Sequence, residues 1–201
     1  MLTLDEGKMA VSLAREALTT YIDRHERIAS VDLPGVFQER RGVFVTLHEC
    51  GELRGCIGYP QPVMPLGKAI IDSAIQAGTG DPRFPKVGAD ELDRLIVEVT
   101  ILTEPQPFLV EKRRLPDEVR IGKHGLIVSR GIFSGLLLPQ VATEWGFDSM
   151  DFLAQTCLKA GLPPDAWLDK ETDVMFFEAQ IFSEDGPRGV VNEKLLSECQ
   201  G

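Results

Sequence analysis

Apolar residues recur at helical spacing in two segments of the first half of the chain. Between residues 10 and 21 they follow the period of an amphipathic helix, and Thr3 with Glu6 makes a capping-box pattern just before them. The sequence therefore predicts an opening helix that ends before about residue 30. A second apolar face runs through residues 66–77, and Gly78 suits the position just after a helix end.

Three stretches of the same half have the composition of β-strands. The segment "GVFVTLHE" from Gly42 and the segment "LRGCIG" at residues 53–58 flank Cys50 and Gly51, which predicts a hairpin with a tight turn. The segment "LIVEVTIL" from Leu95 indicates a buried strand. Residues 103–120, with three prolines and a charge cluster, interrupt the pattern and are predicted to be a linker.

The pattern then runs a second time. "GLIVS" matches "GVFVT", "GLLLPQV" takes the place of "GCIGYPQPV", "QTCLKAG" that of "DSAIQAG", and "FEAQIF" that of "VEVTIL". The offset is 83 residues between Gly42 and Gly125, and 80 between Glu98 and Glu178. Four matches in the same order favour an internal duplication of a strand-helix-strand unit, with repeats at about 42–102 and 125–182 of a single domain spanning 1–201.

The helix of the second repeat has complete start and stop signals. Asp148 is a suitable N-cap with Asp151 three residues on, and Gly161 followed by Pro163 ends the helix. Strands followed by a helix and a further strand, twice over, predict an α+β fold with two lobes and mostly antiparallel sheets.

Composition narrows the function classes. The 201 residues are 43% hydrophobic and 26% charged, with a formal net charge of −10. This charge argues against nucleic acid as a partner, because phosphate binding needs clustered Lys and Arg. No leader pattern is present, and no apolar run approaches the ~18 residues of a membrane span. We therefore expect a cytoplasmic protein that does not bind membranes.

The four cysteines give no sign of a metal or disulfide framework. Cys50, Cys56, Cys157 and Cys199 form no CxxC pair and no finger-like spacing with histidine. No nucleotide-binding motif is present either, so the sequence implies neither a metal nor a cofactor. Cys157 lies on the apolar face of its helix and is expected in the core.

Several long motifs resemble the AMMECR family, which takes its name from the chromosomal region of Alport syndrome, midface hypoplasia and elliptocytosis. The similarity is carried by "ELRGCIGYPQP", "DPRFPKV", the segment from "GKHGLIVSRG" to "LPPDAW", and "FEAQIF", and it runs from the first helix to Phe182. The resemblance implies a two-lobed α+β fold with an internal duplication, but no established activity. Family members occur alone, or fused and co-encoded with Memo-type and radical-SAM proteins, which suggests a shared small-molecule or protein-modifying pathway.

This chain departs from the family pattern at two places. Tyr59 and Pro60 follow the "LRGCIG" motif where other members carry threonine, as in the microbial branch of the family. Relatives read "DG" where this chain has His124 and Gly125, which weakens His124 as a general base or ligand-binding residue.

Cys56 is the candidate for chemistry. In a regular strand Arg54 and Cys56 share a face, and a nearby guanidinium would lower the pKa of the thiol. Gly55 and Gly58 weaken a strand, which often marks the close approach of a ligand or of another backbone. The alternative is that Cys56 is a small buried side chain and that the glycines serve packing alone.

A base for the thiol is harder to identify. A two-residue loop at Cys50 and Gly51 would place His48 opposite Leu53, on the face away from Cys56, whereas a three-residue loop would reverse this. Glu98 and Glu178 lie inside apolar strands, where a carboxylate must be either exposed or paired with a cation; exposure is the simpler interpretation.

Three further residues are candidates for ligand binding. Asp81 and Arg83 follow the end of the second predicted helix, and the simplest interpretation is an Asp-Pro turn in which the two side chains pair. Gln140 holds a position near that of Cys56 in the repeat register and could present its amide to the same cleft. Trp145 and Trp167 are expected to fill the core of the second lobe.

Two hypotheses for function remain open. The protein is either an enzyme or enzyme component that binds a small molecule or modified peptide in a cleft at the junction of the repeats, with Arg54 and Cys56 in the site, or a non-catalytic module. In the second case the "LRGCIG" surface would be presented to a protein partner, such as a radical-SAM or Memo-type protein.

Overall fold

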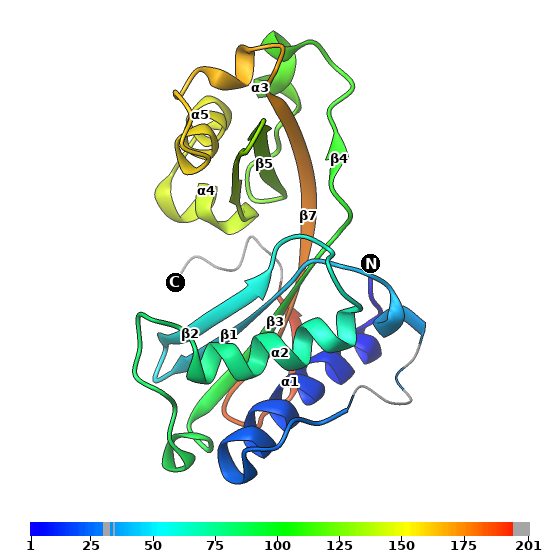
Figure 1. Cartoon of the computed structure of the whole chain (residues 1–201), viewed down its shortest axis with the longest axis vertical. Coiled ribbons are helices and arrows are strands. Elements are labelled where there is room, and N and C mark those ends of the chain that lie inside the picture. The colour runs from blue at the N-terminus through cyan, green and yellow to red at the C-terminus, as the bar shows by residue number, and fades with distance from the viewer. Residues whose placement is uncertain (30–32, 34, 195–201) are drawn as a thin grey trace. The chain divides into compact units, whose positions relative to one another are not determined.

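The structure, a computed structural model, describes residues 1–29, 33 and 35–194. Within these residues the chain has five α-helices and eight strands, and all described strand pairs are antiparallel, which confirms the predicted α+β class (Figure 1). The helices are α1 (Leu4–Arg24), α2 (Leu66–Thr79), α3 (Leu115–Glu118), α4 (Pro139–Trp145) and α5 (Ser149–Lys159). The strands are β1 (Val43–Glu49), β2 (Glu52–Tyr59), β3 (Leu95–Leu102), β4 (Gln106–Pro107), β5 (His124–Arg130), β6 (Phe133–Leu137), β7 (Asp173–Glu184) and β8 (Val191–Lys194).

The chain divides into two compact units. Unit 1 comprises residues 1–102 and 180–194, and unit 2 comprises residues 103–179. Strand β7 contributes its first half to unit 2 and its second half to unit 1. No helix in the described part of the chain has the length and apolar character that crossing a membrane requires.

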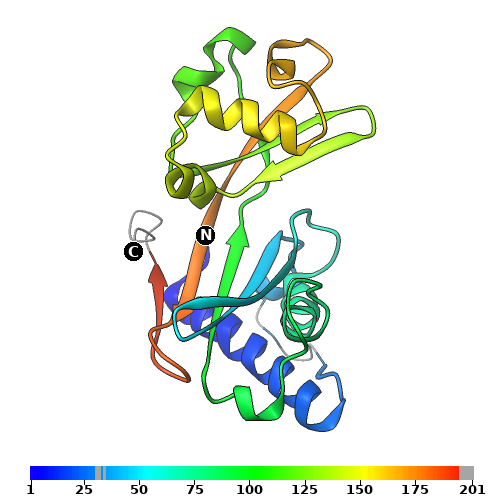
Figure 2. The ribbon, with the colours of Figure 1, turned by 90° about the vertical axis from the view of Figure 1, so that its left-hand side faces the viewer.

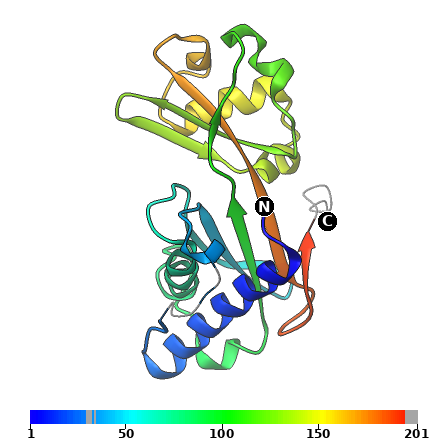
Figure 3. The same cartoon turned by 90° about the vertical axis from the view of Figure 1, so that its right-hand side faces the viewer.

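In unit 1, α1 and α2 pack together and cover one face of the strands β1, β2 and β3 (Figures 1 and 3). Alternate residues of β1 face these helices, so that Val43, Val45 and Leu47 are fully buried while the residues between them are not. The predicted capping box of α1 is confirmed, since Thr3 Oγ1 accepts a hydrogen bond from the backbone N–H of Glu6 and the Glu6 side chain accepts one from that of Thr3.

Gly78 has a different role from the one that the sequence predicts. Helix α2 continues to Thr79 and Gly80 caps it, so Gly78 lies inside the helix. A Cβ atom at Gly78 would overlap the side chain of Leu18 on α1. The glycine therefore permits the close approach of the two helices.

The hairpin of β1 and β2 has the predicted two-residue turn but an irregular register. Cys50 and Gly51 have φ angles of 53° and 83°, which is the left-handed conformation that tight hairpins need. His48 pairs with Leu53, whereas Leu47 pairs with Gly55. Arg54 is thus the additional residue of a β-bulge, and the pattern of faces along β2 changes at this point.

In unit 2, β7 lies between β4 and β5, and β6 pairs with β5. Helix α5 packs over the β5–β6 hairpin (Figure 2), and its predicted caps are confirmed. Asp148 accepts a hydrogen bond from the N–H of Asp151, and Gly161 has a positive φ of 76° directly after the C-cap. Residues 103–120 are more than a linker, because they include β4 and α3, and Leu115 is 2% exposed in the core of this unit.

Only part of the predicted core of unit 2 is correct. Cys157 is fully buried and Trp167 is 6% exposed, as expected. Trp145, at the end of α4, is 73% exposed and does not belong to the core. Cys199 lies outside the described residues.

The two units have the same strand order. In each unit the first strand of the hairpin lies in the middle, between the second strand of the hairpin and the last strand of the unit. The order is β2-β1-β3 in one unit and β6-β5-β7 in the other. The predicted offsets of 83 and 80 residues do not fit the same pairing, because Thr46 pairs with Glu98 whereas Ser129, 83 residues further on, pairs with Asp173 and not with Glu178. The duplication itself stays a prediction.

Candidate functional site

Cys56 lies on the face of β2 that points away from the helices of unit 1. Its neighbour Gly55 is buried against the backbone of Ala77 on α2, so the next residue along the strand faces the other side. Thr46 on β1 lies directly opposite and donates a hydrogen bond from Oγ1 to Cys56 Sγ at 3.2 Å. Thr46 is in turn opposite Glu98 on β3. Cys56, Thr46 and Glu98 therefore form one row across three strands, and this row together with His48 is named the Cys56 face.

Glu98 is paired, and not exposed as the simpler interpretation had it. Its side chain is 13% exposed, and Lys194 Nζ on β8 lies 2.8 Å from its Oε2. Burial alone would raise the pKa of this carboxyl, but His48 and Lys194 outweigh burial and the pKa is lowered. Glu98 is thus a carboxylate held in the sheet next to Thr46.

His48 is on the Cys56 face, which corrects the expectation from the sequence. It pairs with Leu53, as the two-residue turn requires. The bulge at Arg54, however, shifts the rest of β2 by one residue relative to β1. As a result Thr46 and His48, which are two residues apart on β1, lie on the same face as Cys56. His48 is a diagonal neighbour of Cys56, for which the usual spacing is about 7–8 Å. Its Nε2 lies 4.0 Å from Glu98 Oε1, too far for a hydrogen bond, and this buried nitrogen has no hydrogen-bond partner among the described residues.

The Arg54 guanidinium is engaged elsewhere. Nε and Nη2 donate to the two carboxylate oxygens of Glu91 at 2.7 and 3.0 Å, and Nη1 donates to the carbonyl of Pro85 at 2.9 Å. The side chain is 12% exposed, and this bidentate pair fixes the loop between α2 and β3 to the bulge of β2. The predicted action of Arg54 on the thiol is therefore wrong.

Burial raises the pKa of the Cys56 thiol, and the hydrogen bond from Thr46 and the positive charge of Arg83 only partly offset this effect. The cation that acts on Cys56 is Arg83. A raised pKa means that the thiol is protonated near neutral pH, so nucleophilic chemistry at this atom needs a proton acceptor.

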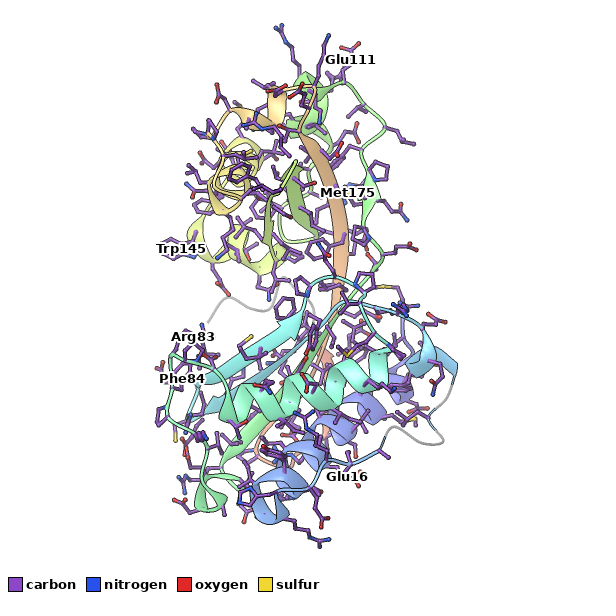
Figure 4. All side chains as sticks on the ribbon, viewed as in Figure 1. Glu16, Arg83, Phe84, Glu111, Trp145 and Met175 are labelled. Atoms are coloured by element: carbon purple, nitrogen blue, oxygen red, sulfur yellow. The ribbon has the colours of Figure 1, made fainter. Side chains whose placement is uncertain are left out.

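Asp81 and Arg83 hold the backbone of Cys56 from its open side. Strand β2 ends the sheet order, so no strand of the described residues lies beyond Cys56. Asp81 Oδ2 accepts a hydrogen bond from Cys56 N at 2.9 Å, and Arg83 Nη2 donates to Cys56 O at 3.3 Å. The two side chains pair at 2.7 Å, as the Asp-Pro turn predicts, and the hydrogen bonds from Arg83 hold the pKa of Asp81 well below its usual range. Figure 4 shows Arg83 in the loop that follows α2. The pair thus takes the place of a neighbouring strand at Cys56.

The glycines of the motif have a packing role. A Cβ atom at Gly55 would overlap the carbonyl oxygen of Ala77, and one at Gly58 would overlap the carbonyl oxygen of Val43 and the ring of Phe44. Both positions require the absence of a side chain because other parts of unit 1 approach closely. Ligand binding is not needed to explain them.

His124 and Gln140 belong to unit 2. His124 is 6% exposed, its Nδ1 accepts a hydrogen bond from the N–H of Arg120 at 3.2 Å, and its ring lies 4.7 Å from that of Phe176. Burial lowers the pKa of His124, so this residue is a neutral part of the packing. Gln140 lies on α4, and its Oε1 is buried without a hydrogen-bond partner in the described structure. A cleft that joins these residues to Cys56 stays a prediction.

Sequence reasoning missed Thr46, and it assigned no site role to His48 or Glu98. The alternation along "GVFVTLHE" and the position of Glu98 in "LIVEVTIL" place all three on one side of their strands, so a correct register would have grouped them. Among the described residues, no three His, Cys, Asp or Glu side chains lie close enough together to hold a metal ion.

The fold and this face define an α+β protein whose edge strand carries a half-buried thiol braced by an Asp-Arg pair. Residues 11–182 match the family model AMMECR1. A protein from Methanosarcina acetivorans is 57% identical over 200 residues, covering 97% of this chain and all of that protein, and one from Methanothermobacter thermautotrophicus is 56% identical, covering 92% and 97%. The crystal structure of the uncharacterized protein PH0010 from Pyrococcus horikoshii matches with a TM-score of 0.85 and 47% identity, covering 94% of this chain and 96% of the other. The chain belongs to the AMMECR1 family.

Proposed function

We propose that the Cys56 face binds a small molecule or a modified peptide in an enzyme or enzyme component, with the Cys56 thiol as the group that contacts or attacks it. The observation that supports this most strongly is the buried Nε2 of His48, which has no hydrogen-bond partner among the described residues and lies on the same face as a half-buried thiol. An unpaired buried polar atom costs free energy, so its presence in a folded protein calls for an explanation such as a functional role.

The side chains have distinct roles in this proposal. Cys56 is protonated at rest, and its proton is transferred to His48 Nε2 when the thiol reacts. Because diagonal neighbours are usually about 7–8 Å apart, this transfer needs an intervening group, such as a hydroxyl group of the bound molecule. The imidazolium that forms would lie about 4 Å from the Glu98 carboxylate, as the 4.0 Å separation in the structure indicates, and this attraction stabilises it. Thr46 orients the sulfur, and Asp81 with Arg83 fixes the backbone that carries it. Cysteine enzymes likewise combine a nucleophile, a base and an acid, although here Glu98 lies beside Nε2, the same ring nitrogen that receives the proton.

The second candidate is a non-catalytic module that presents the same surface to a protein partner, such as a radical-SAM or Memo-type protein. It is favoured by the rigid bracing of the motif, because Arg54 pairs with Glu91, Asp81 pairs with Arg83 and both glycines serve packing. A raised thiol pKa also fits a structural cysteine. Under this hypothesis His48 contributes to a contact surface and not to proton transfer.

We further propose that the two units are duplicates and that only unit 1 retains the chemistry. Gly135 packs against the backbone of Ala160 at the end of α5, as Gly55 packs against Ala77 at the end of α2. With these glycines matched, Cys56 corresponds to Leu136, and Thr46, its partner across the hairpin, corresponds to Ile127. A superposition of the two units with matching handedness would support this history, and opposite handedness of the connections would overturn it.

A panel of chloroacetamide fragments with similar intrinsic reactivity tests whether the Cys56 face is a binding site. Cys50, in the exposed turn of the same hairpin, is the internal control. If the face recognises ligands, the labelling rates of Cys56 will differ about tenfold or more between fragments, while those of Cys50 follow the intrinsic reactivity. If both cysteines rank the fragments in the same order with the same spread, the face has no ligand selectivity and the proposal fails.

A further inference from the structure

Trp145 is the exposed tryptophan of unit 2, and it lines a surface groove between α4, α5 and the end of β6. The groove has a volume of about 260 Å³ and includes Leu137, Val141 and Leu158. Trp145 is 73% exposed and Leu158 is 50% exposed, and Figure 4 shows the Trp145 side chain at the outside of this unit. The Trp145 ring stacks on Phe147 with an interplanar angle of 19°. Large apolar side chains gathered at a surface mark an interaction site.

The size and charge of the groove restrict what it can hold. Its volume lies below the roughly 300–1,000 Å³ of pockets for drug-sized molecules, so it suits a single bulky side chain. Of the described residues that line it, only Lys159 is charged. Among the described residues Lys159 takes part in no ion pair, so a carboxylate on the bound molecule would find an available partner.

Strand β6 adds a second binding element beside the groove. It is the last strand in the sheet order, and the two-residue turn at Gly131 and Ile132 makes Arg130 and Phe133 the closing pair of the hairpin. Hydrogen-bonded and open pairs alternate from there, so the N–H and C=O of Leu136 point away from β5. The edge of β2 is occupied by Asp81 and Arg83 at Cys56, whereas no described side chain occupies the edge of β6 in this way.

The two elements are aligned. Gly135 is buried against α5 and Leu137 lines the groove, so these alternate residues face the helix side of the hairpin. A chain that pairs with β6 at Leu136 would direct its own alternate side chains to that same side. One of these side chains would enter the groove between Trp145 and Leu158.

We propose that this surface binds an extended peptide by strand addition to β6, with a bulky apolar side chain in the Trp145 groove and a nearby Asp or Glu against Lys159. Main-chain hydrogen bonds to Leu136 supply the general affinity, and the groove and the lysine supply the selectivity. The site belongs to unit 2 and shares no residue with the Cys56 face, so it goes beyond the proposed function and neither result depends on the other.

A random linear peptide library displayed on phage, selected against the full chain, provides the probe. The enriched sequences are expected to share a bulky apolar residue with an Asp or Glu two or three positions away. A synthetic peptide of the enriched sequence should bind Trp145→Ser at least about tenfold more weakly, since central aromatic residues carry much of the binding energy at such sites. Lys159→Glu should weaken binding by a similar factor, and Leu109→Ser, which replaces an apolar residue that is 93% exposed and outside the groove, should not change it.

N-methylated versions of the same peptide test strand addition without altering the protein. Methylation of the amide that pairs with Leu136 should abolish binding, while methylation of the adjacent amide is tolerated. The proposal is overturned if no sequence is enriched, if the peptide binds Trp145→Ser as well as it binds the parent chain, or if no single N-methylation weakens binding. Should Trp145→Ser fail to fold, Leu158→Ser and Lys159→Glu decide the same question, because both side chains lie at the surface.

Discussion

Replacing Asp81 by asparagine removes one charge from the pair that holds the backbone of Cys56. The carboxylate accepts from donors on both oxygens: Oδ1 accepts from Arg83 N at 3.1 Å and Nε at 3.0 Å, and Oδ2 accepts from Cys56 N at 2.9 Å and Arg83 Nη2 at 2.7 Å. An asparagine side chain has only one oxygen, so its NH₂ group must face two donors whichever way the amide is turned.

The loss can be estimated from these contacts. Hydrogen bonds to charged groups contribute about 1.5–3 kcal/mol each, and two of them are lost on the side of the amide nitrogen. Asp81 is 2% exposed while Arg83 is 54% exposed, so the arginine can return to water and the cost falls toward the lower end. We expect Asp81→Asn to lower the free energy of unfolding by about 3 kcal/mol.

Urea unfolding of the full chain measures this difference, with Asp93→Asn as the control. Asp93 also pairs with an arginine, Arg188, but its side chain is 80% exposed, and such a pair contributes about 0–1 kcal/mol. Equal stabilities of the two variants would refute the claim that Asp81 braces the edge of β2.

The same pair gives a dependence on pH. Arg83 lowers the pKa of Asp81 in the folded chain, so the stabilisation is complete above the unfolded pKa of about 3.9 and is lost as the pH falls toward the folded value. The stability difference between the parent chain and Asp81→Asn should therefore shrink below about pH 4. A difference that stays constant down to pH 2 would mean that the carboxylate charge has no role.

Three further predictions concern other parts of unit 1. Glu184→Gln should destabilise the chain by about 3–5 kcal/mol in urea unfolding, because it leaves the buried Arg15 without its bidentate partner. The two carboxylate oxygens of Glu184 lie 2.6 and 2.5 Å from Arg15 Nε and Nη2. The double variant Arg15→Met with Glu184→Leu should recover most of the lost stability, and no recovery would mean that the pair is not the cause. Gly55→Ala should lower the free energy of unfolding by about 1–3 kcal/mol, because the added methyl group overlaps the backbone of Ala77. Gly35→Ala, which has open space around the added atom, should leave the stability nearly unchanged. Similar thermal midpoints for the two variants would contradict the packing role of Gly55. Arg54→Met should leave the alkylation rate of Cys56 unchanged, and Arg83→Gln should lower it, since Arg83 is the cation that acts on the thiol. If mass spectrometry shows instead that only Arg54→Met lowers the alkylation rate, Arg54 is the cation that acts on the thiol.

The parts of the fold that depend on local signals could be predicted from the sequence. The capping box at Thr3, the N-cap at Asp148 and the hairpin turn at Cys50 are all present, because each is determined by residues within a few positions of one another. Features that depend on distant contacts could not be predicted in this way. Gly78 has the composition of a helix end, but the approach of Leu18 gives it a different role.

The candidate site shows the same division. The pairing of Asp81 with Arg83 follows from the sequence. The bulge at Arg54 does not, and it decides that Arg54 turns to Glu91 and that His48 shares a face with Cys56. Glu98 appeared exposed from its sequence neighbours, because its partner Lys194 is 96 residues away. Trp145 resembled a core residue by composition alone, and its exposure reflects its place at the end of a short surface helix.

The rate at which iodoacetamide alkylates Cys56, followed against pH by mass spectrometry in the parent chain and in His48→Gln, tests whether the Cys56 face is a thiol-based site. Cys50 serves as the exposed reference, Cys157 as the buried one, and His25→Asn, a change at the exposed C-cap of α1, as the control substitution. We expect Cys56 to react in the folded protein much faster than Cys157. We also expect His48→Gln to lower the rate of Cys56 about tenfold near neutral pH, while His25→Asn has no effect. If Cys56 stays unlabelled until the protein unfolds, or if His48→Gln reacts at the parent rate, the Cys56 face is not a thiol-based site and the non-catalytic module is the better description.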